Sequence, residues 1–227
     1  MNTTNSANGA PGTSDAISAL ELTKVFDGHV AVDRLSLHVP HGSFFGLVGP
    51  NGAGKSTTIS MITGLLRPDG GTVWIGANET WRDPVAAKQQ IGVLPENLRL
   101  FERLSGEEML RYVGQIRGMD REVVGERSDE LLETLGLVDA RDKLIADYST
   151  GMRKKIGLAA ALLHAPQVLF LDEPFESVDP VSVRTIRHVL ERFTSSGATI
   201  VFSSHVMAIV EDLCDRVAVM NLSLIHI

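Results

Sequence analysis

The chain has 227 residues, of which 44% are hydrophobic and 22% charged, and its formal net charge is −7. This composition is typical of a water-soluble globular protein with room for one large α/β domain. The acidic balance argues against a nucleic acid as the main partner, because phosphate backbones attract basic surfaces, and the single cysteine, Cys214, excludes an intrachain disulfide.

The N-terminal residues 1–15 are mostly Asn, Ser, Thr, Gly and Ala, which bury too little surface to fold, so they are predicted to form a flexible leader. They lack a basic stretch followed by an apolar one, so no secretion signal is expected. The longest uncharged run, 156–171, is interrupted by His164, Pro166 and Gln167. It falls short of the roughly 20 apolar residues of a bilayer helix, and no membrane span is predicted.

Strand patterns and helix patterns alternate at both ends of the chain. Strands are predicted at 19–26, 35–39, 44–48, 72–75, 91–94, 168–171, 199–202 and 216–220. Helices are predicted at 55–65, 105–117, 122–135, 152–164, 181–194 and 205–213. Several of the strands are almost continuously apolar, as expected of parallel strands covered on both faces. The sequence therefore predicts an α/β fold with a mostly parallel core sheet and a helical insert over about residues 97–164.

The first helix of this insert has a clear start signal. Ser105 is a good N-cap, and two glutamates follow it in the first turn. Met109, Leu110, Val113 and Ile116 share one face of the helix. Such a face packs in a core more often than it binds a partner, so core packing is expected here.

A phosphate-binding pattern follows the strand 44–48. It is G-x-x-x-x-G-K-[ST], and it is matched by Gly49, Pro50, Asn51, Gly52, Ala53, Gly54, Lys55, Ser56 and Thr57. The glycines let backbone N–H groups point at phosphate oxygens, and the helix N-terminus adds a positive dipole. Lys55 is expected to reach the outer phosphates and the Ser56 hydroxyl to ligate Mg²⁺. An ordinary Gly-rich turn is the alternative, but the full match favours a nucleoside triphosphate site.

Two carboxylates follow the apolar strand 168–171. The carboxyl end of a parallel strand is where ligands bind, and Asp172 is expected to hold Mg²⁺, directly or through water. Glu173 is placed to accept a proton from an attacking water. A solvent-exposed acidic strand end is the alternative, and the nearby phosphate pattern favours the catalytic interpretation.

The order of motifs resembles the nucleotide-binding subunit of an ABC transporter, and the resemblance covers residues 17–221. In that family the segment at 148–152 is the signature, usually Leu-Ser-Gly-Gly-Gln. Ser149 and Gly151 match it, whereas Thr150 and Met152 depart from it. The resemblance implies an ABC ATPase domain of the P-loop NTPase class over 16–221, with an antiparallel N-terminal β subdomain. It also implies that the signature binds, in trans, the γ-phosphate of ATP held by a second cassette.

The resemblance assigns roles to three further residues. Asp179 belongs to a loop that crosses the dimer interface, although Asp179 and Pro180 would also make an ordinary helix start. His205 matches the switch histidine that contacts the γ-phosphate; otherwise it would be a solvated helix cap. Phe26 matches the aromatic residue that stacks on adenine, where the family more often has tyrosine; otherwise it would pack in the core.

Glu96 departs from the family pattern, which usually has glutamine at this position. That glutamine ligates Mg²⁺ and senses the transmembrane partner. Glutamate is also an oxygen donor and suits a hard cation, so metal binding is expected to survive. The extra negative charge should matter most when Mg²⁺ is absent.

The implied function is that of an ATP-binding and hydrolysing subunit with Mg²⁺. Two copies would close on ATP, as a homodimer, and drive a separate integral membrane permease, with export favoured over import. The chain would sit at the cytoplasmic face of the cell membrane through that permease, with no nucleic acid as partner. The alternatives are an ABC-type ATPase that serves no transporter and a regulatory module with low turnover.

The last six residues, 222–227, read Leu-Ser-Leu-Ile-His-Ile. One frame of a transposon-end adapter used in sequencing libraries would encode this string. We therefore interpret them as a non-native scar of cloning or assembly. A natural apolar tail that forms an edge strand is the alternative.

Overall fold

The computed structural model describes residues 15–221 and 224–226. The predicted leader lies outside the described residues except for Asp15, which is the first residue of strand β1 (Asp15–Phe26). Asp15 pairs with Pro40 of the next strand, and its carboxylate lies 3.0 Å from His38 Nδ1. These partners hold Asp15 in the sheet, and the prediction of a leader before it concerns residues outside the described range.

The core sheet has the strand order β10-β9-β3-β8-β7-β6. Its strands are β3 (Phe44–Val48), β6 (Ile91–Leu94), β7 (Val168–Asp172), β8 (Thr199–Ser204), β9 (Arg216–Asn221) and β10 (Leu224–His226). The first five are mutually parallel, and every residue of β3, β7 and β8 is buried. This confirms the predicted parallel core.

Strand β10 pairs with β9 in the antiparallel sense. It falls within the six residues interpreted as a scar, of which 222, 223 and 227 lie outside the described residues. The interpretation of 222–227 stays a prediction.

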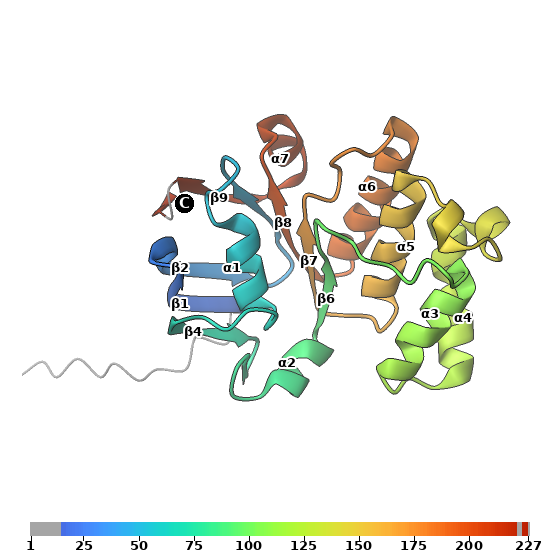
Figure 1. Ribbon diagram of the computed structural model, residues 1–227, viewed down its shortest axis with the longest axis horizontal. Coiled ribbons are helices and arrows are strands. Elements are labelled where there is room, and N and C mark those ends of the chain that lie inside the picture. The colour runs from blue at the N-terminus through green and yellow to red at the C-terminus, as the bar shows by residue number, and fades with distance from the viewer. Residues whose placement is uncertain (1–14, 222–223, 227) are drawn as a thin grey trace, which may run out of the picture.

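A second, antiparallel sheet lies beside the core sheet, with the order β2-β1-β4-β5. Its other strands are β2 (His29–Pro40), β4 (Gly70–Ile75) and β5 (Asn78–Glu79). Helix α1 (Lys55–Ile62) lies between the two sheets in Figure 1 and contacts both. Its buried side chains join inward-facing residues of both sheets in one hydrophobic cluster, which confirms the predicted N-terminal β subdomain.

The helices of the predicted insert lie on the far side of the core sheet from this β subdomain (Figure 1). They are α3 (Gly106–Ile116), α4 (Arg121–Thr134) and α5 (Thr150–Leu162), with the short 3-10 turns η1 (Val138–Ala140) and η2 (Ile145–Asp147). Helices α6 (Pro180–Ser195) and α7 (Met207–Leu213) complete this side, and α2 (Pro84–Gln89) precedes β6. No helix in the described ranges combines the length and the hydrophobicity that a bilayer crossing requires.

The predicted core face of α3 is only partly correct. Met109 and Leu110 are buried, whereas Ile116 at the end of the helix is 67% exposed. Ser105 caps the helix as predicted, in a reciprocal capping box with Glu108. Ile116 is the last residue of α3, and Gly118 follows it with a positive φ of +69°.

The parallel arrangement brings the carboxyl ends of neighbouring strands to one edge of the core sheet. Strand β3 leads into the loop 49–54, β6 ends just before Glu96, β7 ends at Asp172 and β8 ends just before His205. These segments are far apart in the sequence. The topology of the sheet is what gathers them, as is general for open parallel sheets.

Candidate functional site

The loop between β3 and α1 is built around glycines that no other residue could replace easily. Gly54 is the N-cap of α1 and has φ +95°, and a Cβ there would lie 2.6 Å from the carbonyl oxygen of Ala31. A Cβ at Gly49 would collide with the backbone of Met220. Residues 49–57 thus form a tight turn, and its backbone enters the N-terminus of a helix, the arrangement that binds phosphate.

Lys55 is the first residue of α1 and is only 5% exposed. Its ammonium group donates to the carbonyl oxygens of Gly49, at 2.8 Å, and Pro50, at 3.3 Å. It also lies 3.8 Å from Oε1 of Glu173. The lysine of the phosphate loop and the predicted catalytic carboxylate therefore face each other across the same site.

Glu173 also faces His205. The two side chains approach to 3.0 Å between Oε1 and Nδ1, and the imidazole N–H donates to the carboxylate. Glu173 is 7% exposed and has a positive φ of +46°, which is strained for a residue with a side chain. His205 precedes α7 by two residues, so the prediction of a helix that begins at 205 is wrong. His205 lies in the short loop between β8 and α7.

Asp172, the last residue of β7, is buried. The Ser203 hydroxyl donates to Oδ1 of Asp172 and accepts a hydrogen bond of 3.1 Å from the backbone N–H of Glu173. Ser203 thus aligns both members of the acidic pair through one oxygen. This role was not predicted, although Ser203 stands two residues before His205, the predicted switch histidine.

The phosphate loop, Glu173 and His205 border a cavity of about 570 Å³. Ten of the predicted site residues line it: Phe26, Asn51, Gly52, Gly54, Lys55, Ser56, Thr57, Glu96, Glu173 and His205. Gly49, Pro50, Ala53 and Asp172 belong to the adjoining loop and strand but do not line the cavity. The structure therefore places most of the predicted residues around a single space.

Three lining residues were not predicted. His29 and Ala31 come from β2, and Glu176 follows β7. Glu176 could have been found, because it is the third carboxylate within the five residues 172–176 that follow a buried strand. The two β2 residues carried no local signal, since a different sheet delivers them.

Phe26 ends β1 at the rim of this cavity. Its side chain is 44% exposed, so it does not pack in the core. The ammonium group of Lys24 lies 5.5 Å from the centre of the ring. An exposed aromatic ring at the mouth of a polar cavity offers a flat surface on which a base could stack.

Ser149, Gly151 and Asp179 are not part of the cavity. Ser149 is the N-cap of α5 and accepts from Met152 N, and Asp179 is the N-cap of α6 and accepts from the N–H groups of Val181 and Ser182. These hydrogen bonds, above all the one from Ser182 N–H, lower the pKa of Asp179. The predicted helix start at Asp179 and Pro180 is confirmed.

Gly151 joins these two helix starts. A Cβ at this position would lie 2.5 Å from Oδ2 of Asp179 and equally close to the Ser182 hydroxyl. The N-termini of α5 and α6 can approach each other only because residue 151 has no side chain.

The oxygen donors at and beside the cavity suit Mg²⁺ only if other ligands complete its coordination. The Ser56 hydroxyl and the carboxylates of Glu96 and Asp172 are hard oxygen donors. In the part of the chain that the structure describes, no group of three or more His, Cys, Asp or Glu side chains could hold a metal alone. Magnesium bound through one or two carboxylates takes the rest of its ligands from water and substrate phosphates. The residues present fit that pattern.

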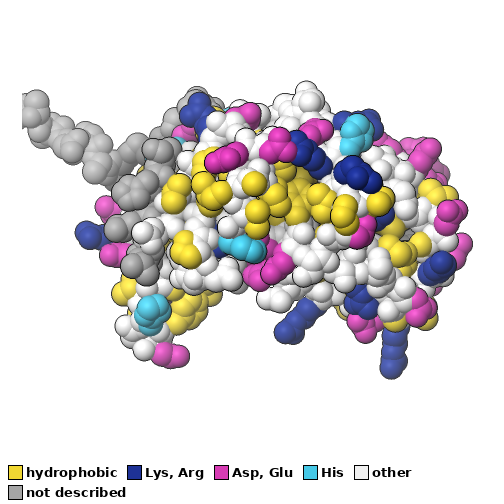
Figure 2. All heavy atoms as spheres, turned by 90° about the horizontal axis from the view of Figure 1, so that it is seen from above, with side chains coloured by type: hydrophobic (Ala, Val, Ile, Leu, Met, Phe, Trp, Pro, Cys, Tyr) yellow, Lys and Arg dark blue, Asp and Glu magenta, His cyan; other side chains and the backbone are white. Residues whose placement is uncertain are grey.

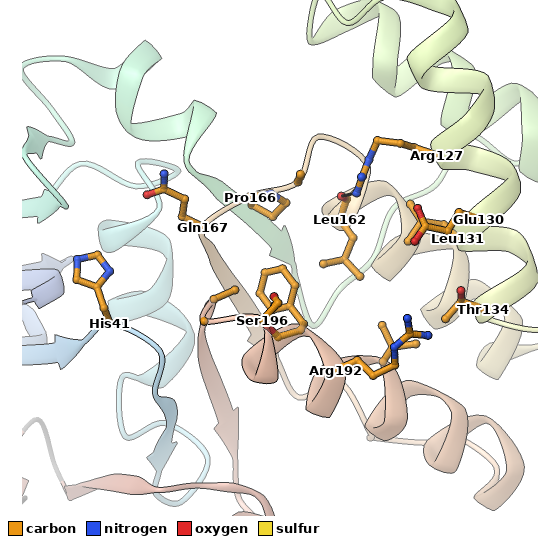
Figure 3. Close-up of a pocket in the computed structure, with 15 residues that line it drawn as sticks. His41, Arg127, Glu130, Leu131, Thr134, Leu162, Pro166, Gln167, Arg192 and Ser196 are labelled. Atoms are coloured by element: carbon orange, nitrogen blue, oxygen red, sulfur yellow. Dashed lines mark hydrogen bonds between the residues drawn. The ribbon is translucent and has the colours of Figure 1, made fainter.

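A second cavity, of about 530 Å³, lies at the opposite edge of the core sheet (Figure 3). It is formed between α4, α5 and α6, and none of the predicted site residues lines it. Arg127 turns toward the end of α5, where it donates to the carbonyl oxygens of Leu163, at 2.6 Å, and Leu162, at 3.2 Å. This arginine satisfies the end of a helix, which is a structural role.

Comparison with known proteins gives a consistent result. The family model described as "ABC transporter" matches residues 32–176. The chain is 39% identical to the daunorubicin/doxorubicin resistance ATP-binding protein DrrA of Streptomyces peucetius, over 91% of this chain and 62% of that protein. It is 36% identical to the linearmycin resistance ATP-binding protein LnrL of Bacillus subtilis, over 90% of this chain and 66% of that protein. The chain thus spans less than two thirds of the length of either relative.

Solved structures agree with these sequence matches. One described as the ATP binding subunit of an ABC transporter superposes with a TM-score of 0.85 at 28% identity, and the match covers 92% of this chain and 88% of that one. A nucleotide-free ATP-binding cassette from an ABC transporter gives a TM-score of 0.83 at 25% identity, with 94% and 90% covered.

Proposed function

The chain belongs to the ABC transporter family, and from this premise we propose that it binds and hydrolyses ATP to drive a separate membrane permease. The observation that carries this proposal is the meeting of Lys55 and Glu173, 3.8 Å apart, at one cavity. Lys55 belongs to a phosphate-binding loop and Glu173 is a buried carboxylate able to act as a base.

Each residue has a role in this proposal. The N–H groups of the loop 49–57 and the Lys55 ammonium bind the phosphate tail, and Phe26 stacks on adenine. Glu173 accepts a proton from the attacking water, and His205 orients the Glu173 carboxylate through their hydrogen bond. Ser56, Glu96 and Asp172 hold Mg²⁺, which when bound supplies positive charge to offset the phosphate oxygens. That charge matters here because Glu96, Glu173 and Glu176 all line the cavity.

We further propose that two copies close on ATP. Ser149 and Gly151 begin a helix outside their own cavity, and Ser149 is exposed, so this helix N-terminus could receive an anion held by another copy. Exposed hydrophobic side chains support such an interface: Val181 is 63% exposed, Val206 39% and Met207 47%. Figure 2 looks onto this end of the molecule from above and shows hydrophobic side chains in a band across it.

A different surface supports the permease as partner. A groove of about 510 Å³ lies between the end of β6 and the helices α3 and α5, and its lining includes Leu98, Leu100 and Val113. The nearby side chains of Phe101 and Ile116 are 54% and 67% exposed. An apolar groove with exposed large side chains beside it is typical of a protein interface. Docking there would place the chain at the cytoplasmic face of the membrane.

Export is the direction that the relatives favour. Both named relatives are resistance proteins, DrrA toward daunorubicin and doxorubicin and LnrL toward linearmycin. We propose the same general role, removal of an organic compound from the cell, without assigning the compound.

The test is to measure Mg-ATP binding by calorimetry and phosphate release by the purified chain. Lys55→Ala should weaken ATP binding by at least about tenfold, which corresponds to about 1.4 kcal/mol, because the substitution removes a charge from the phosphate site. Lys143→Ala, at an exposed position, is the matched control and should change neither quantity. Absence of Mg-ATP binding by the unmodified chain would refute the proposal. Binding with no phosphate release would favour a regulatory module.

A further inference from the structure

A single buried lysine connects the segments that follow two neighbouring strands. Lys154 lies one turn into α5 and is 7% exposed. Its ammonium group donates to the backbone carbonyl oxygen of Glu173, at 3.2 Å, and to that of Glu96, at 3.4 Å. Glu173 follows β7 directly and Glu96 follows the adjacent strand β6. One side chain of the helical region thus reaches both segments.

The contact with Glu173 matters because the backbone there is strained. Its φ of +46° is unfavourable for a residue with a Cβ, and such a conformation persists only where the surroundings hold it. The backbone N–H of Glu173 is held by the Ser203 hydroxyl, and its carbonyl oxygen by Lys154. Side chains from two other elements therefore fix both polar backbone groups of this residue.

The Lys154 ammonium group donates its hydrogen bonds to backbone carbonyl groups, although several carboxylates lie near it. Glu176, Asp172, Glu96 and Glu173 all attract it, but within the described residues none forms an ion pair with it at 4.0 Å or less. Burial outweighs their attraction and lowers the pKa of Lys154. Keeping an ammonium group in such a place is costly unless its hydrogen bonds are made.

The neighbouring residue Lys155 offers a comparison. It is similarly buried, at 9% exposed, and burial also lowers its pKa. Asp179, the N-cap of α6, is the carboxylate that attracts it, and among the described residues Lys155 makes no hydrogen bond to Glu173 or Glu96. Of these two neighbouring lysines, Lys154 is the one that donates to the carbonyl oxygens of Glu173 and Glu96.

We propose that Lys154 is a positioning residue that holds the strained backbone of Glu173 and couples it to the segment of Glu96. By fixing the carbonyl group, it keeps the Glu173 carboxylate directed at Lys55 and the cavity. Because the segment of Glu96 adjoins the groove assigned to the permease, a displacement there is passed to Glu173 through Lys154. This inference rests on the proposed function for its catalytic consequence, but the tether itself is a statement about the folded chain.

The test compares Lys154→Met, which keeps the length and removes the donors, with Lys154→Arg, which keeps donors. Lys155→Met is the matched control. Hydrogen exchange is followed in peptides that cover 172–177 and 95–98, alongside ATP affinity and turnover. Lys154→Met should raise exchange in both segments about tenfold and lower kcat about a hundredfold, with ATP affinity within about threefold of the unmodified chain. Lys154→Arg should restore most of both, and Lys155→Met should leave exchange in 172–177 unchanged.

Two results would overturn the inference: unchanged exchange at 172–177 in Lys154→Met, or a kcat near that of the unmodified chain. If Lys154→Met does not fold, Lys154→Gln is tested in its place, because its shorter amide cannot reach both carbonyl groups. Unchanged exchange and turnover in Lys154→Gln would equally overturn the inference. If the unmodified chain neither binds nor hydrolyses ATP, the proposed function fails, and the exchange data alone judge the tether.

Discussion

Glu96 takes part in the site in two separate ways. The residue lines the cavity, and its backbone carbonyl accepts from Lys154. A substitution of the side chain therefore leaves the backbone contact in place. This separation allows the carboxylate to be tested without a change in the surrounding structure.

Glu96→Gln should change ATP hydrolysis at saturating Mg-ATP by less than about tenfold, because the amide oxygen remains a donor for a hard cation. ATP binding in the presence of a chelator should become tighter, since one of the carboxylates that repel the triphosphate is gone. Both are measured on the purified chain by phosphate release and by calorimetry with EDTA. A loss of hydrolysis of a hundredfold or more would show that the carboxylate has a role beyond holding the metal.

Gly151→Ala should destabilise the chain, by about 1–3 kcal/mol for such an overpacked contact. The new Cβ would lie 2.5 Å from Oδ2 of Asp179, so the N-termini of α5 and α6 must move apart. Gly125→Ala is the matched control, because Gly125 lies inside α4 and a Cβ there meets nothing within 4 Å. That control should gain about 0.5–1 kcal/mol. Urea unfolding of both variants checks this, and equal stability of the two would contradict the packing argument.

The bounds of several elements were predicted closely, whereas one short helix was missed although a cap marks its start. The bounds of β3 and β6 are as predicted. Helix α1 ends at Ile62 and not at 65, because Gly64 takes a positive φ of +71° just after the end, a common stop signal. Helix α2 was missed, although Asp83 and Pro84 are an N-cap and first helical residue.

His164 lies two residues after the end of helix α5, and it should make the unfolding free energy depend on pH. His164 Nε2 lies 2.9 Å from the carbonyl oxygen of Ile91, and its Nδ1 is buried without a partner among the described residues. Burial lowers the pKa of His164 to about 4, and the charges of Arg117 and Arg127 add to this effect. The folded state therefore prefers the neutral imidazole.

The unfolding free energy should accordingly fall as the pH is lowered from about 6.5, the unfolded pKa, to about 4. Between these two pH values the unfolded chain binds a proton that the folded chain excludes. The contribution of neutral His164 to stability is therefore fully present above about pH 6.5 and is lost as the pH falls toward about 4. Its size, discounted for partial exposure, is on the order of 2 kcal/mol. His164→Gln keeps an N–H donor and removes the titrating group. The unfolding free energy of this variant should therefore fall by about 2 kcal/mol less than that of the unmodified chain. If the unfolding free energies of the two chains fell by the same amount between pH 7 and pH 4, this prediction would be contradicted.

At the scale of the whole molecule, the sequence predicted the site better than it predicted the contacts within the site. The motif at 49–57 and the acidic pair after β7 carry their function in local spacing, so the residues around the cavity could be named. His29, Ser203 and the reach of Lys154 could not, because sheet order and helix packing bring them to the site. The trans role of Ser149, Gly151 and Asp179 stays a prediction, since it concerns a second copy.

Glu173→Gln tests that role directly. The substitution removes the base but keeps a side chain of the same size, so ATP should remain bound and hold two copies together. With ATP and Mg²⁺, light scattering after size-exclusion chromatography should give twice the monomer mass of 24.6 kDa; with ADP it should give the monomer. Adding Lys55→Ala should abolish the dimer, because the phosphate tail that bridges the copies is no longer gripped. A monomer under all conditions, in a variant shown to bind ATP, would mean that Ser149 and Gly151 do not act on a second copy.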